Sequence, residues 1–474
     1  MLFNSLEFLI FFAIVYGLYL LLNRQHQWQN YMLLVASCIF YGAWDWRFLF
    51  LIFTFITMDF LFGLKIYEAK NEKTRKQLLA LSITINLSIL GFFKYFNFFV
   101  DSFCGLLNFF HIPFSLVTLH ILLPVGISFY TFQSMSYTID VYRNKMIPTK
   151  RFWDYALFVT YFPHLVAGPI MRAKDLLPQV LSSRKLSLEK FYEGSFLVFW
   201  GLFEKIFIAD NLAKIVNPIF ASPPPYNGGE VWVALYAFSF QIFCDFDAYS
   251  NMARGLGKCM GFEILYNFNL PYFSTNPREF WQRWHISLSS WLKGYLYISL
   301  GGNRQSEMMT YRNLAITMLL GGLWHGASWT FILWGAYHGL LLIVYRYFPV
   351  YRGEVHSTPP MSRKWFIPKV ILFFHLVTLG WLLFRAQSIH QVAQMVSALL
   401  FSFSVDHATL SLFLRFLGFV VPLIMIQLGQ FKTDDLMFLY RRHWLIKTIA
   451  YALMSYAMLS WGVMKAEEFI YFQF

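Results

Sequence analysis

Long apolar runs, separated by short polar segments, recur along almost the whole chain. A run of about 20 mostly apolar residues is long enough to cross a bilayer as a helix. The pattern predicts such helices at 5–22, 47–64, 78–93, 117–137, 153–170, 195–209, 230–244, 366–384, 409–428 and 444–462. The apolar segments 31–43 and 311–345 have irregular lengths. The sequence therefore predicts an all-α, polytopic membrane bundle of roughly ten to twelve spans, several of them short or broken.

The segment 262–304 departs from this pattern because it mixes aromatic residues with charged ones. It is too polar for a simple span, and amphipathic helices at the membrane interface, or partly sunk into the protein, fit it. The residues STNP predict a helix start at Pro277, with Glu279 in the first turn. Aromatic and leucine side chains from Phe280 to Trp291 then recur at helical spacing and predict one apolar face.

The segment from Tyr311 to Tyr345 is too long for one ordinary span. Gly321, Gly322 and Gly326 lie near its middle, where glycine weakens a helix or permits close packing. We therefore expect a helix, a disturbance around Gly321–Gly326, and a second helix that carries Trp329 to Leu342.

Composition and charge support a membrane protein. The chain is 58% hydrophobic and 13% charged, against about 25% charged residues in globular domains. Its net charge is +13, but the basic residues are dispersed between apolar runs, which argues against nucleic acid as a partner. Basic clusters at 65–77, 143–151 and 346–369 predict cytoplasmic loops and an N-terminus on the outside. The first apolar run is expected to be a retained helix rather than a signal peptide.

The domain organisation is predicted to be simple. We expect one membrane-embedded domain, 1–474, with a front bundle at about 1–221, a back half at about 230–345 that carries the candidate chemistry, and C-terminal helices at about 366–474. The proline-rich residues 222–229 predict the loop that separates the first two parts. The four cysteines show neither zinc spacing nor a disulfide framework, and we interpret them as packing residues.

The apolar back half contains histidines, which can take and return a proton near neutral pH. Polar groups at membrane depth are costly and usually face a cavity or a partner. On one continuous helix, His325 and His338 would be offset by roughly 140° and about 20 Å, so they can act together only if the chain bends. His325 lies at the expected break and is the favoured functional residue, against a satisfied core histidine. For His338, a packing role beside Gly339 explains the residue equally well. Residue type alone favours an interfacial position for His285.

Two acids, Asp245 and Asp247, adjoin an apolar span. Ion pairing with Arg254 or a neighbouring arginine at a helix end is favoured over a role in proton transfer. The chain contains no G-x-x-x-x-G-K-[ST], G-x-S-x-G or H-E-x-x-H motif. The sequence therefore gives no support for ATP hydrolysis, a serine nucleophile or a bound metal.

Several segments resemble the membrane-bound O-acyltransferase family, and within it the bacterial alginate O-acetyltransferase branch. They are LPVGISFYTFQ at 123–133, FPHLVAGPIMR at 162–172, YNFNLPYFSTNPREFWQRWHISLSSWL at 266–292, LGGNR at 300–304 and GGLWHGASW at 321–329. The resemblance implies a helical bundle around a central tunnel, with His325 as the catalytic base and His285 on the cytoplasmic side of the tunnel. The further candidates for the substrate tunnel are Trp324, Gly326, His338, Trp284, Arg283 and Asn303. Trp324 would pack the imidazole, and Gly326 would let the substrate approach the backbone.

The resemblance also implies the substrates and the cellular setting. No cofactor would be bound permanently; the donor would be acetyl-CoA or another acyl-CoA, or an acyl carrier protein thioester. The recipient would be an exopolysaccharide or cell-wall sugar hydroxyl, often reached through an extracytoplasmic acyltransferase partner of the SGNH type. The location would be the bacterial inner membrane, as a multi-pass protein.

This chain also departs from the family pattern. Gly294 and Ser299 stand where the family often has an acid and a proline, and Asn251 stands where it often has an acid; donor contacts and partner choice are therefore less fixed than the histidines. The branch that transfers D-alanine to teichoic acid shares the histidine motifs and is an alternative. Two further alternatives are a transporter or flippase with broken helices and a non-catalytic scaffold for polysaccharide export.

Overall fold

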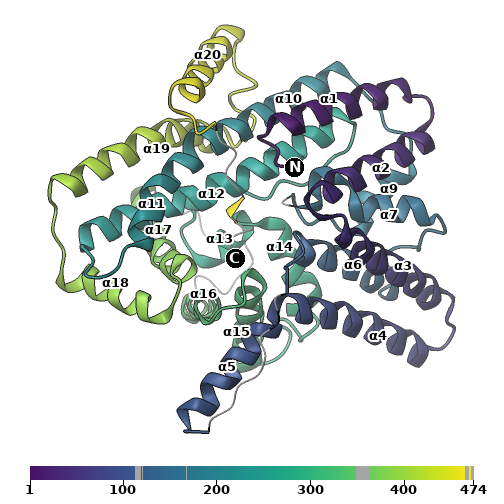
Figure 1. Cartoon of the computed structure of the whole chain (residues 1–474), viewed down its shortest axis with the longest axis horizontal. Coiled ribbons are helices and arrows are strands. Elements are labelled where there is room, and N and C mark those ends of the chain that lie inside the picture. The colour runs from purple at the N-terminus through teal and green to yellow at the C-terminus, as the bar shows by residue number, and fades with distance from the viewer. Residues whose placement is uncertain (113–118, 120, 167, 349–362, 465–468, 471–474) are drawn as a thin grey trace. The chain divides into compact units, whose positions relative to one another are not determined.

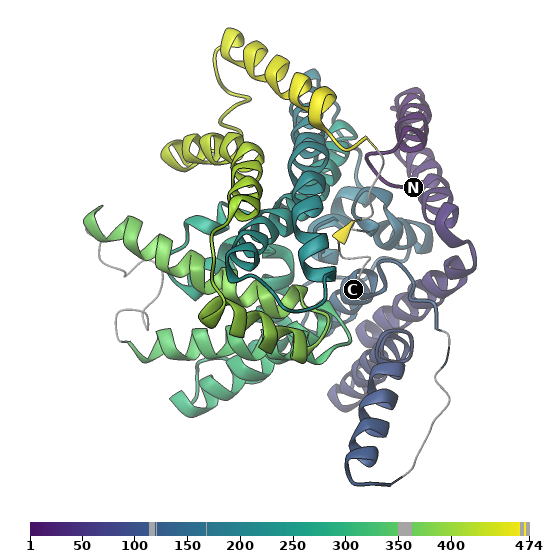
Figure 2. The same ribbon diagram turned by 60° about the vertical axis from the view of Figure 1, so that its left-hand side comes forward.

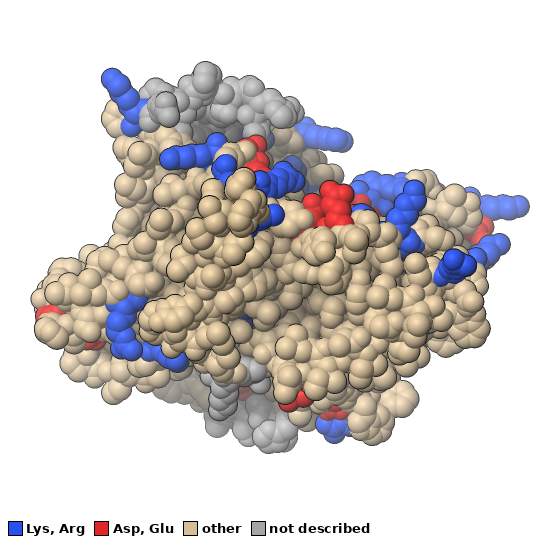
Figure 3. All heavy atoms as spheres, turned by 90° about the horizontal axis from the view of Figure 1, so that it is seen from above, with Lys and Arg blue, Asp and Glu red and all other residues tan. Residues whose placement is uncertain are grey.

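The computed structural model describes residues 1–112, 119, 121–166, 168–348, 363–464 and 469–470. Figure 1 shows the helical arrangement. Within the described ranges the regular elements are helices and no strand is assigned, which confirms the predicted all-α class. Five described helices are long and apolar enough to cross a membrane: Arg47–Glu68, Glu72–Phe109, Gly228–Cys259, Lys364–Arg385 and His407–Thr433. Uncharged residues form most of the surface seen in Figure 3. The count of ten to twelve spans and the sidedness stay predictions, and most of the basic connection 346–369 lies outside the described residues.

The chain divides into two compact units. Unit 1 comprises Met1–Val198 and Met252–Leu265, and unit 2 comprises Phe199–Asn251 and Tyr266–Phe474. Helices α10 (Leu188–Leu202) and α12 (Gly228–Cys259) run through the boundary between these units. The expected single domain and its three parts stay a prediction.

Unit 1 contains the N-terminal helices. They are α1 (Leu6–Leu21), α2 (His26–Asp45), α3 (Arg47–Glu68), α4 (Glu72–Leu90), the π-helix η1 (Gly91–Tyr95), α5 (Phe96–Phe109), α6 (Ile127–Tyr142), α7 (Phe152–Thr160), α8 (Phe162–Leu165) and α9 (Ala173–Leu181). Helix α6 packs against α3, α4, α7 and α9 and is buried over almost its whole length. A Cβ on Gly63 of α3 would lie 2.4 Å from the Tyr137 ring of α6, so glycine permits this close approach.

Two buried polar networks hold unit 1 together. The Asp59 carboxylate accepts hydrogen bonds from the Ser82 hydroxyl at 2.7 Å and the Asn86 amide at 3.0 Å. Arg184 donates to the Tyr19 hydroxyl at 2.8 Å and to the Asn30 amide oxygen at 2.7 Å. Buried polar groups are stable only when they are bonded in this way. These networks therefore fix which helices meet inside an otherwise apolar bundle.

Unit 2 contains the segments that carry the candidate chemistry. Its elements are the π-helix η2 (Phe203–Ala209), α11 (Asp210–Ala221), most of α12, the 3-10 helix η3 (Pro271–Phe273), α13 (Pro277–Arg283), α14 (Ile286–Trp291), the π-helix η4 (Leu292–Tyr297), α15 (Glu307–His325), α16 (Trp329–Tyr347), α17 (Arg363–Arg385), α18 (Ile389–Phe401), α19 (His407–Thr433) and α20 (Trp444–Trp461). The apolar window of α12 is 83% buried. Helix α12 therefore lies in the protein interior rather than in lipid.

Helices α15 and α16 form an antiparallel hairpin whose two arms lie side by side (Figure 1 and Figure 2). A Cβ on Gly322 of α15 would lie 2.2 Å from the carbonyl oxygen of Phe331. A Cβ on Gly335 of α16 would lie 2.3 Å from the carbonyl oxygen of Met318. Small residues let membrane helices approach to backbone contact. The glycine pattern of this segment therefore encodes a tight helix pair.

The structure confirms some predicted boundaries and corrects others. The break in 311–345 exists, but it falls at Gly326–Ser328, because Gly321 and Gly322 lie inside α15. The expected span 153–170 is wrong, since α7 ends at Thr160 and a short helix α8 follows. The described part of the expected helix 117–137 becomes helical only at Ile127, after Gly126 in the left-handed region.

The polar segment also differs from the expectation. Helix α13 begins at Pro277, with the Asn276 side chain accepting from the Glu279 N–H, as predicted. The single helical face from Phe280 to Trp291 is wrong, because α13 ends at Arg283 and α14 begins at Ile286. The aromatic residues of this segment are mostly buried in the protein. They form core, as expected for the alternative in which this segment is sunk into the protein.

Replacing Gly322 by alanine should destabilise unit 2, because the new Cβ would collide with a backbone carbonyl that has no freedom to move aside. Overpacking of this kind costs about 1–3 kcal/mol. The measurement is thermal unfolding of the purified protein in detergent. Gly418→Ala on α19, where nothing lies within 4 Å of the added Cβ, is the matched control. An equal melting temperature for both variants would contradict close packing of the hairpin.

Candidate active site

His325 is the last residue of α15, at the interruption between the two arms of the hairpin. Gly326 follows with an extended backbone, and the Ser328 side chain then caps α16 by accepting from the Thr330 N–H at 3.3 Å. A Cβ on Gly326 would lie 2.1 Å from the Phe331 ring. Glycine at this position therefore makes room for a side chain of α16, which gives it a packing role. The proposed approach of substrate to its backbone stays a prediction.

His285 lies at the junction between α13 and α14, where its φ of 42° is in the left-handed region. Non-glycine residues seldom adopt this conformation, and such strain is concentrated at functional sites. Asn267 holds the junction: its carbonyl accepts from the Ile286 N–H at 2.9 Å, and its side chain accepts from the Ser287 N–H at 3.2 Å. Because the His285 side chain is fully buried, the interfacial position favoured by residue type is wrong.

The two histidines of the sequence motifs lie close together within unit 2. The ring centroids of His285 and His325 are 6.5 Å apart. The Trp324 ring lies 5.9 Å from His285 and 5.1 Å from His325. Both imidazoles are almost completely buried. One small reacting group could therefore face both rings.

His338 joins this arrangement through a tryptophan. The Trp334 ring lies 5.0 Å from His325 and 4.8 Å from His338. A continuous helix would have separated the two histidines, but the interruption at Gly326 puts them on different helices that share Trp334. His338 also stacks on Phe280 at 6.1 Å, and a Cβ on Gly380 of α17 would lie 3.0 Å from its Nε2. It is therefore more closely enclosed than its position in the sequence suggested.

We call His285, His325, His338, Trp324, Trp334 and Trp381 the ring cluster. Trp381 of α17 belongs to it because its ring lies 5.9 Å from Trp334 and 4.8 Å from Trp284. Phe246 of α12 contacts the cluster edge-on, 4.5 Å from His285. Trp334 and Trp381 are not among the site residues predicted from the sequence. A signal was present in their type, because a buried indole N–H needs a partner.

Several ring nitrogens around this cluster have no hydrogen-bond partner among the described residues. They are both nitrogens of His285 and of His338, and the indole nitrogens of Trp281, Trp334 and Trp381. More than nine in ten buried polar groups in native proteins are bonded to protein or to water. Donors and acceptors grouped in this way can form hydrogen bonds to a bound water or to a polar group of a substrate.

The electrostatic setting of His285 follows from this burial. Desolvation in the apolar interior lowers the pKa of the His285 imidazole to about 3, because burial penalises the charged form. The ring is therefore neutral at ordinary pH. A neutral imidazole offers one donor and one acceptor nitrogen, which suits it to hold a hydroxyl group in place.

The other sequence-predicted site residues differ in position. Trp284 is buried against Trp381 and Phe280. Arg283 forms an ion pair with Glu279 at 3.1 Å and donates to the Asn269 carbonyl at 3.1 Å, so it braces the segment before His285. Asn303 is exposed on the loop between η4 and α15, and the ring contacts above do not include it. The assignment of these residues to a substrate tunnel stays a prediction.

One of the two acids of α12, Asp245, has a different partner from the one expected. Lys205 of η2 forms ion pairs with Asp245 at 2.7 Å and with Asp210 at 2.8 Å. Asp245 also accepts from the Ile470 N–H at 2.7 Å. Ion pairing of Asp245 was therefore correctly predicted, but an arginine at a helix end was wrong for it. A lysine inside an apolar run was the signal that the sequence reading missed.

Residues 147–384 match the family model of MBOAT, the membrane-bound O-acyltransferase family. The chain belongs to the membrane-bound O-acyltransferase family. It is 45% identical over 406 residues to the probable alginate O-acetylase AlgI of Pseudomonas putida, covering 85% of this chain and 81% of that protein. It is 46% identical over 407 residues to the probable alginate O-acetylase AlgI of Pseudomonas aeruginosa, covering 85% and 75%. It is 36% identical over 393 residues to the peptidoglycan O-acetyltransferase of Helicobacter pylori, covering 77% and 73%.

The family assignment bears on the two non-enzymatic alternatives, a transporter and a scaffold. The family match includes η2, α12 to α16 and most of α17, and therefore every residue of the ring cluster. It favours an enzyme over the transporter and over the non-catalytic scaffold. The resemblance inferred from the sequence motifs is confirmed.

Replacing Lys205 by methionine should strongly destabilise unit 2 of the acyltransferase. The change would leave Asp210 and Asp245 buried without their cation, and breaking a buried ion pair in this way costs about 3–5 kcal/mol. The measurement is the fraction of folded, monodisperse protein and its melting temperature. Lys190→Met, which removes a partly exposed lysine paired with Glu263, should change stability by about 1 kcal/mol or less. A Lys205 variant as stable as this control would refute the role given to the buried pair.

Proposed function

We propose that this acyltransferase moves an acetyl group from a cytosolic thioester to a hydroxyl of an extracytoplasmic polysaccharide or cell-wall sugar. One observation carries the proposal: the interruption after α15 brings His325 to within 6.5 Å of His285 inside the buried ring cluster. The names of the relatives add support, since they are O-acetylases or O-acetyltransferases of alginate and peptidoglycan.

His325 acts as the general base. The acceptor hydroxyl gives its proton to the imidazole as its oxygen attacks the thioester carbonyl carbon. The tetrahedral intermediate then collapses, the carbon–sulfur bond breaks, and the imidazolium returns the proton to the leaving thiolate. The products are an ester and a free thiol, so atoms and charge balance without a bound cofactor. His325 is preferred to His338 because it ends a helix beside the interruption, whereas His338 is enclosed by Phe280, Trp281 and Gly380.

His285 positions the reacting group. Its neutral ring can donate to, or accept from, a hydroxyl that lies between it and His325. The left-handed backbone at His285, held by Asn267, fixes where the ring points. The enclosing tryptophans keep bulk water away from the thioester, which suppresses hydrolysis.

The donor is acetyl-CoA or an acyl carrier protein thioester that approaches from the cytoplasm. The acyl group passes to an extracytoplasmic acyltransferase partner of the SGNH type, whose serine hydroxyl is then the acceptor, and from this partner to the sugar. The protein lies in the bacterial inner membrane. The tunnel implied by the family resemblance connects the two faces.

D-alanyl transfer to teichoic acid is the second candidate. The chain is 27% identical over 281 residues to the teichoic acid D-alanyltransferase of Bacillus subtilis, covering 56% of this chain. This similarity is weaker and shorter than the similarity to the O-acetylases. Incubation of proteoliposomes with either radiolabelled acetyl-CoA or a D-alanyl carrier protein separates the two donors. Transfer of a radiolabelled D-alanyl group from the carrier protein, without transfer of a radiolabelled acetyl group from acetyl-CoA, would favour the second candidate.

His325→Ala should lower the rate of acetyl transfer by about a hundredfold or more, because positioned acid–base catalysis contributes about 10²- to 10⁴-fold. The measurement is transfer of radiolabel from acetyl-CoA in proteoliposomes that also contain the partner and the acceptor. His390→Ala, which removes an exposed histidine of α18, is the matched control and should keep full activity. If His325→Ala folds normally and retains more than about a tenth of the activity, the imidazole is not the base.

A further inference from the structure

Helix α19 carries an arginine inside an apolar sequence. Arg415 follows HATLSLFL and precedes FLGFVVPLIMI, and its side chain is exposed on the surface of the helix. Among the described residues it has no hydrogen bond or ion pair. An ionisable group within a membrane span is costly and usually has a partner. No described residue of this chain supplies such a partner to Arg415.

The depth of Arg415 limits what this partner can be. Helix α19 has 27 residues and is about 40 Å long at about 1.5 Å per residue, so it exceeds the hydrocarbon core of about 30 Å. Arg415 lies about 12 Å along the axis from His407. For a helix centred on the core, about 5 Å extends beyond each face, so the Cα of Arg415 lies about 7 Å inside the hydrocarbon. An arginine side chain at that depth can extend its guanidinium to the headgroup level.

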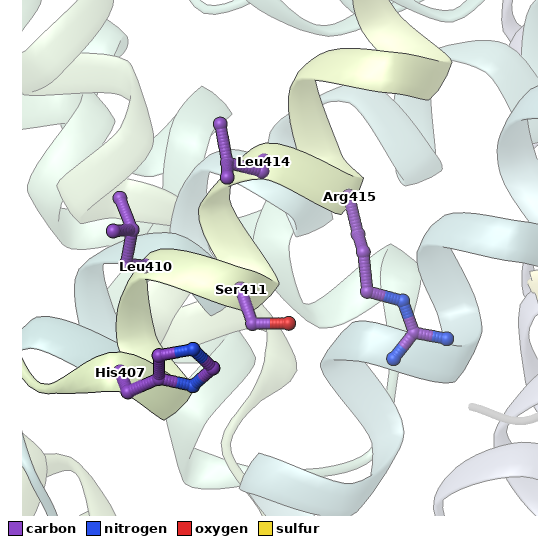
Figure 4. Close-up of a pocket in the computed structure, with 5 residues that line it drawn as sticks. All are labelled: His407, Leu410, Ser411, Leu414 and Arg415. Atoms are coloured by element: carbon purple, nitrogen blue, oxygen red, sulfur yellow. The ribbon is translucent and has the colours of Figure 1, made fainter.

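The direction of the side chain agrees with this geometry. Side chains of a helix tilt toward its N-terminus, which at Arg415 is the nearer membrane surface. In Figure 4 the Arg415 side chain runs back toward the level of His407. The His407 imidazole, the Ser411 hydroxyl and the Arg415 guanidinium extend to the same side of the helix in that view. Three groups that can donate hydrogen bonds are therefore presented together.

These groups line a surface hollow of about 400 Å³, whose other lining residues are Leu410 and Leu414. A hollow with cationic and hydroxyl donors beside leucine side chains matches a phospholipid. The phosphate would accept from the polar groups, and the acyl chains would lie along the leucines. A free inorganic phosphate would gain nothing from the leucines.

We propose that His407, Ser411 and Arg415 form a binding site for the phosphate of a membrane phospholipid, at the end of α19 where the helix begins. The basic residues at and after the other end of this helix, Lys432 in its last turn and Arg441 and Arg442 beyond it, place that end in the cytoplasm by the positive-inside rule. The lipid therefore belongs to the extracytoplasmic leaflet. This site is separate from the ring cluster, and it does not depend on the proposed reaction.

The test is native mass spectrometry of the purified protein titrated with phosphatidylglycerol. Arg415→Gln should weaken lipid binding about fivefold, the scale expected when one basic residue near a membrane surface is lost, and Arg415→Lys should retain most of the binding. Arg441→Gln, which removes an exposed arginine paired with Asp435 beyond the helix, is the matched control. Equal melting temperatures of the variants establish that each is folded.

Three outcomes would overturn the proposal. The first is unchanged lipid binding by Arg415→Gln. The second is displacement of the bound lipid by millimolar inorganic phosphate, which would identify an ion site. The third is loss of a co-purifying protein, rather than of lipid, from Arg415→Gln, which would identify a protein interface.

Discussion

The interruption of the chain between α15 and α16 is the constraint on which the ring cluster depends. Without it, His325 and His338 would lie about 20 Å apart along one helix. With it, both contact the single ring of Trp334. Glycines permit this arrangement twice: Gly322 and Gly335 bring the two helices to backbone contact, and Gly326 makes room for Phe331. The same packing that closes the hairpin thus places His325 at a helix end, where a ring can face a reacting group.

The second constraint is that polar groups inside an apolar interior need bonding partners. Many of the buried polar side chains have hydrogen bonds or ion pairs within the protein, as in the networks of Asp59 and Lys205. The ring cluster differs, because nitrogens of His285, His338 and Trp334 are grouped together without a partner among the described residues, whereas other such atoms, for example in Thr131 and Ser274, belong to separate parts of the protein. Such a group of atoms is costly to bury unless a guest completes it. The proposed transfer of an acyl group to a hydroxyl has this requirement, since the polar atoms of the site must be available to the substrate.

Part of this arrangement was predictable from the sequence. The apolar runs gave the helical class, and the glycines of 311–345 gave a broken helix, because both depend on local physics. The position of the break was off by a few residues, since Gly321 and Gly322 serve packing between helices rather than local flexibility. The left-handed backbone at His285 could not be predicted from the sequence, because Asn267, which holds this turn by hydrogen bonds, lies outside the helical pattern. The pairing of Asp245 with Lys205 was missed for the same reason: it joins elements distant in sequence.

The central claim is that the ring cluster encloses a polar guest, and an experimental density map tests it most directly. The measurement is a high-resolution cryo-electron microscopy map of the protein in lipid nanodiscs, without added substrate. The account predicts ordered density at hydrogen-bonding distance from ring nitrogens of His285, His338 or Trp334. Rings packed tightly against one another, with each of these nitrogens bonded to a protein group and no density between them, would contradict it.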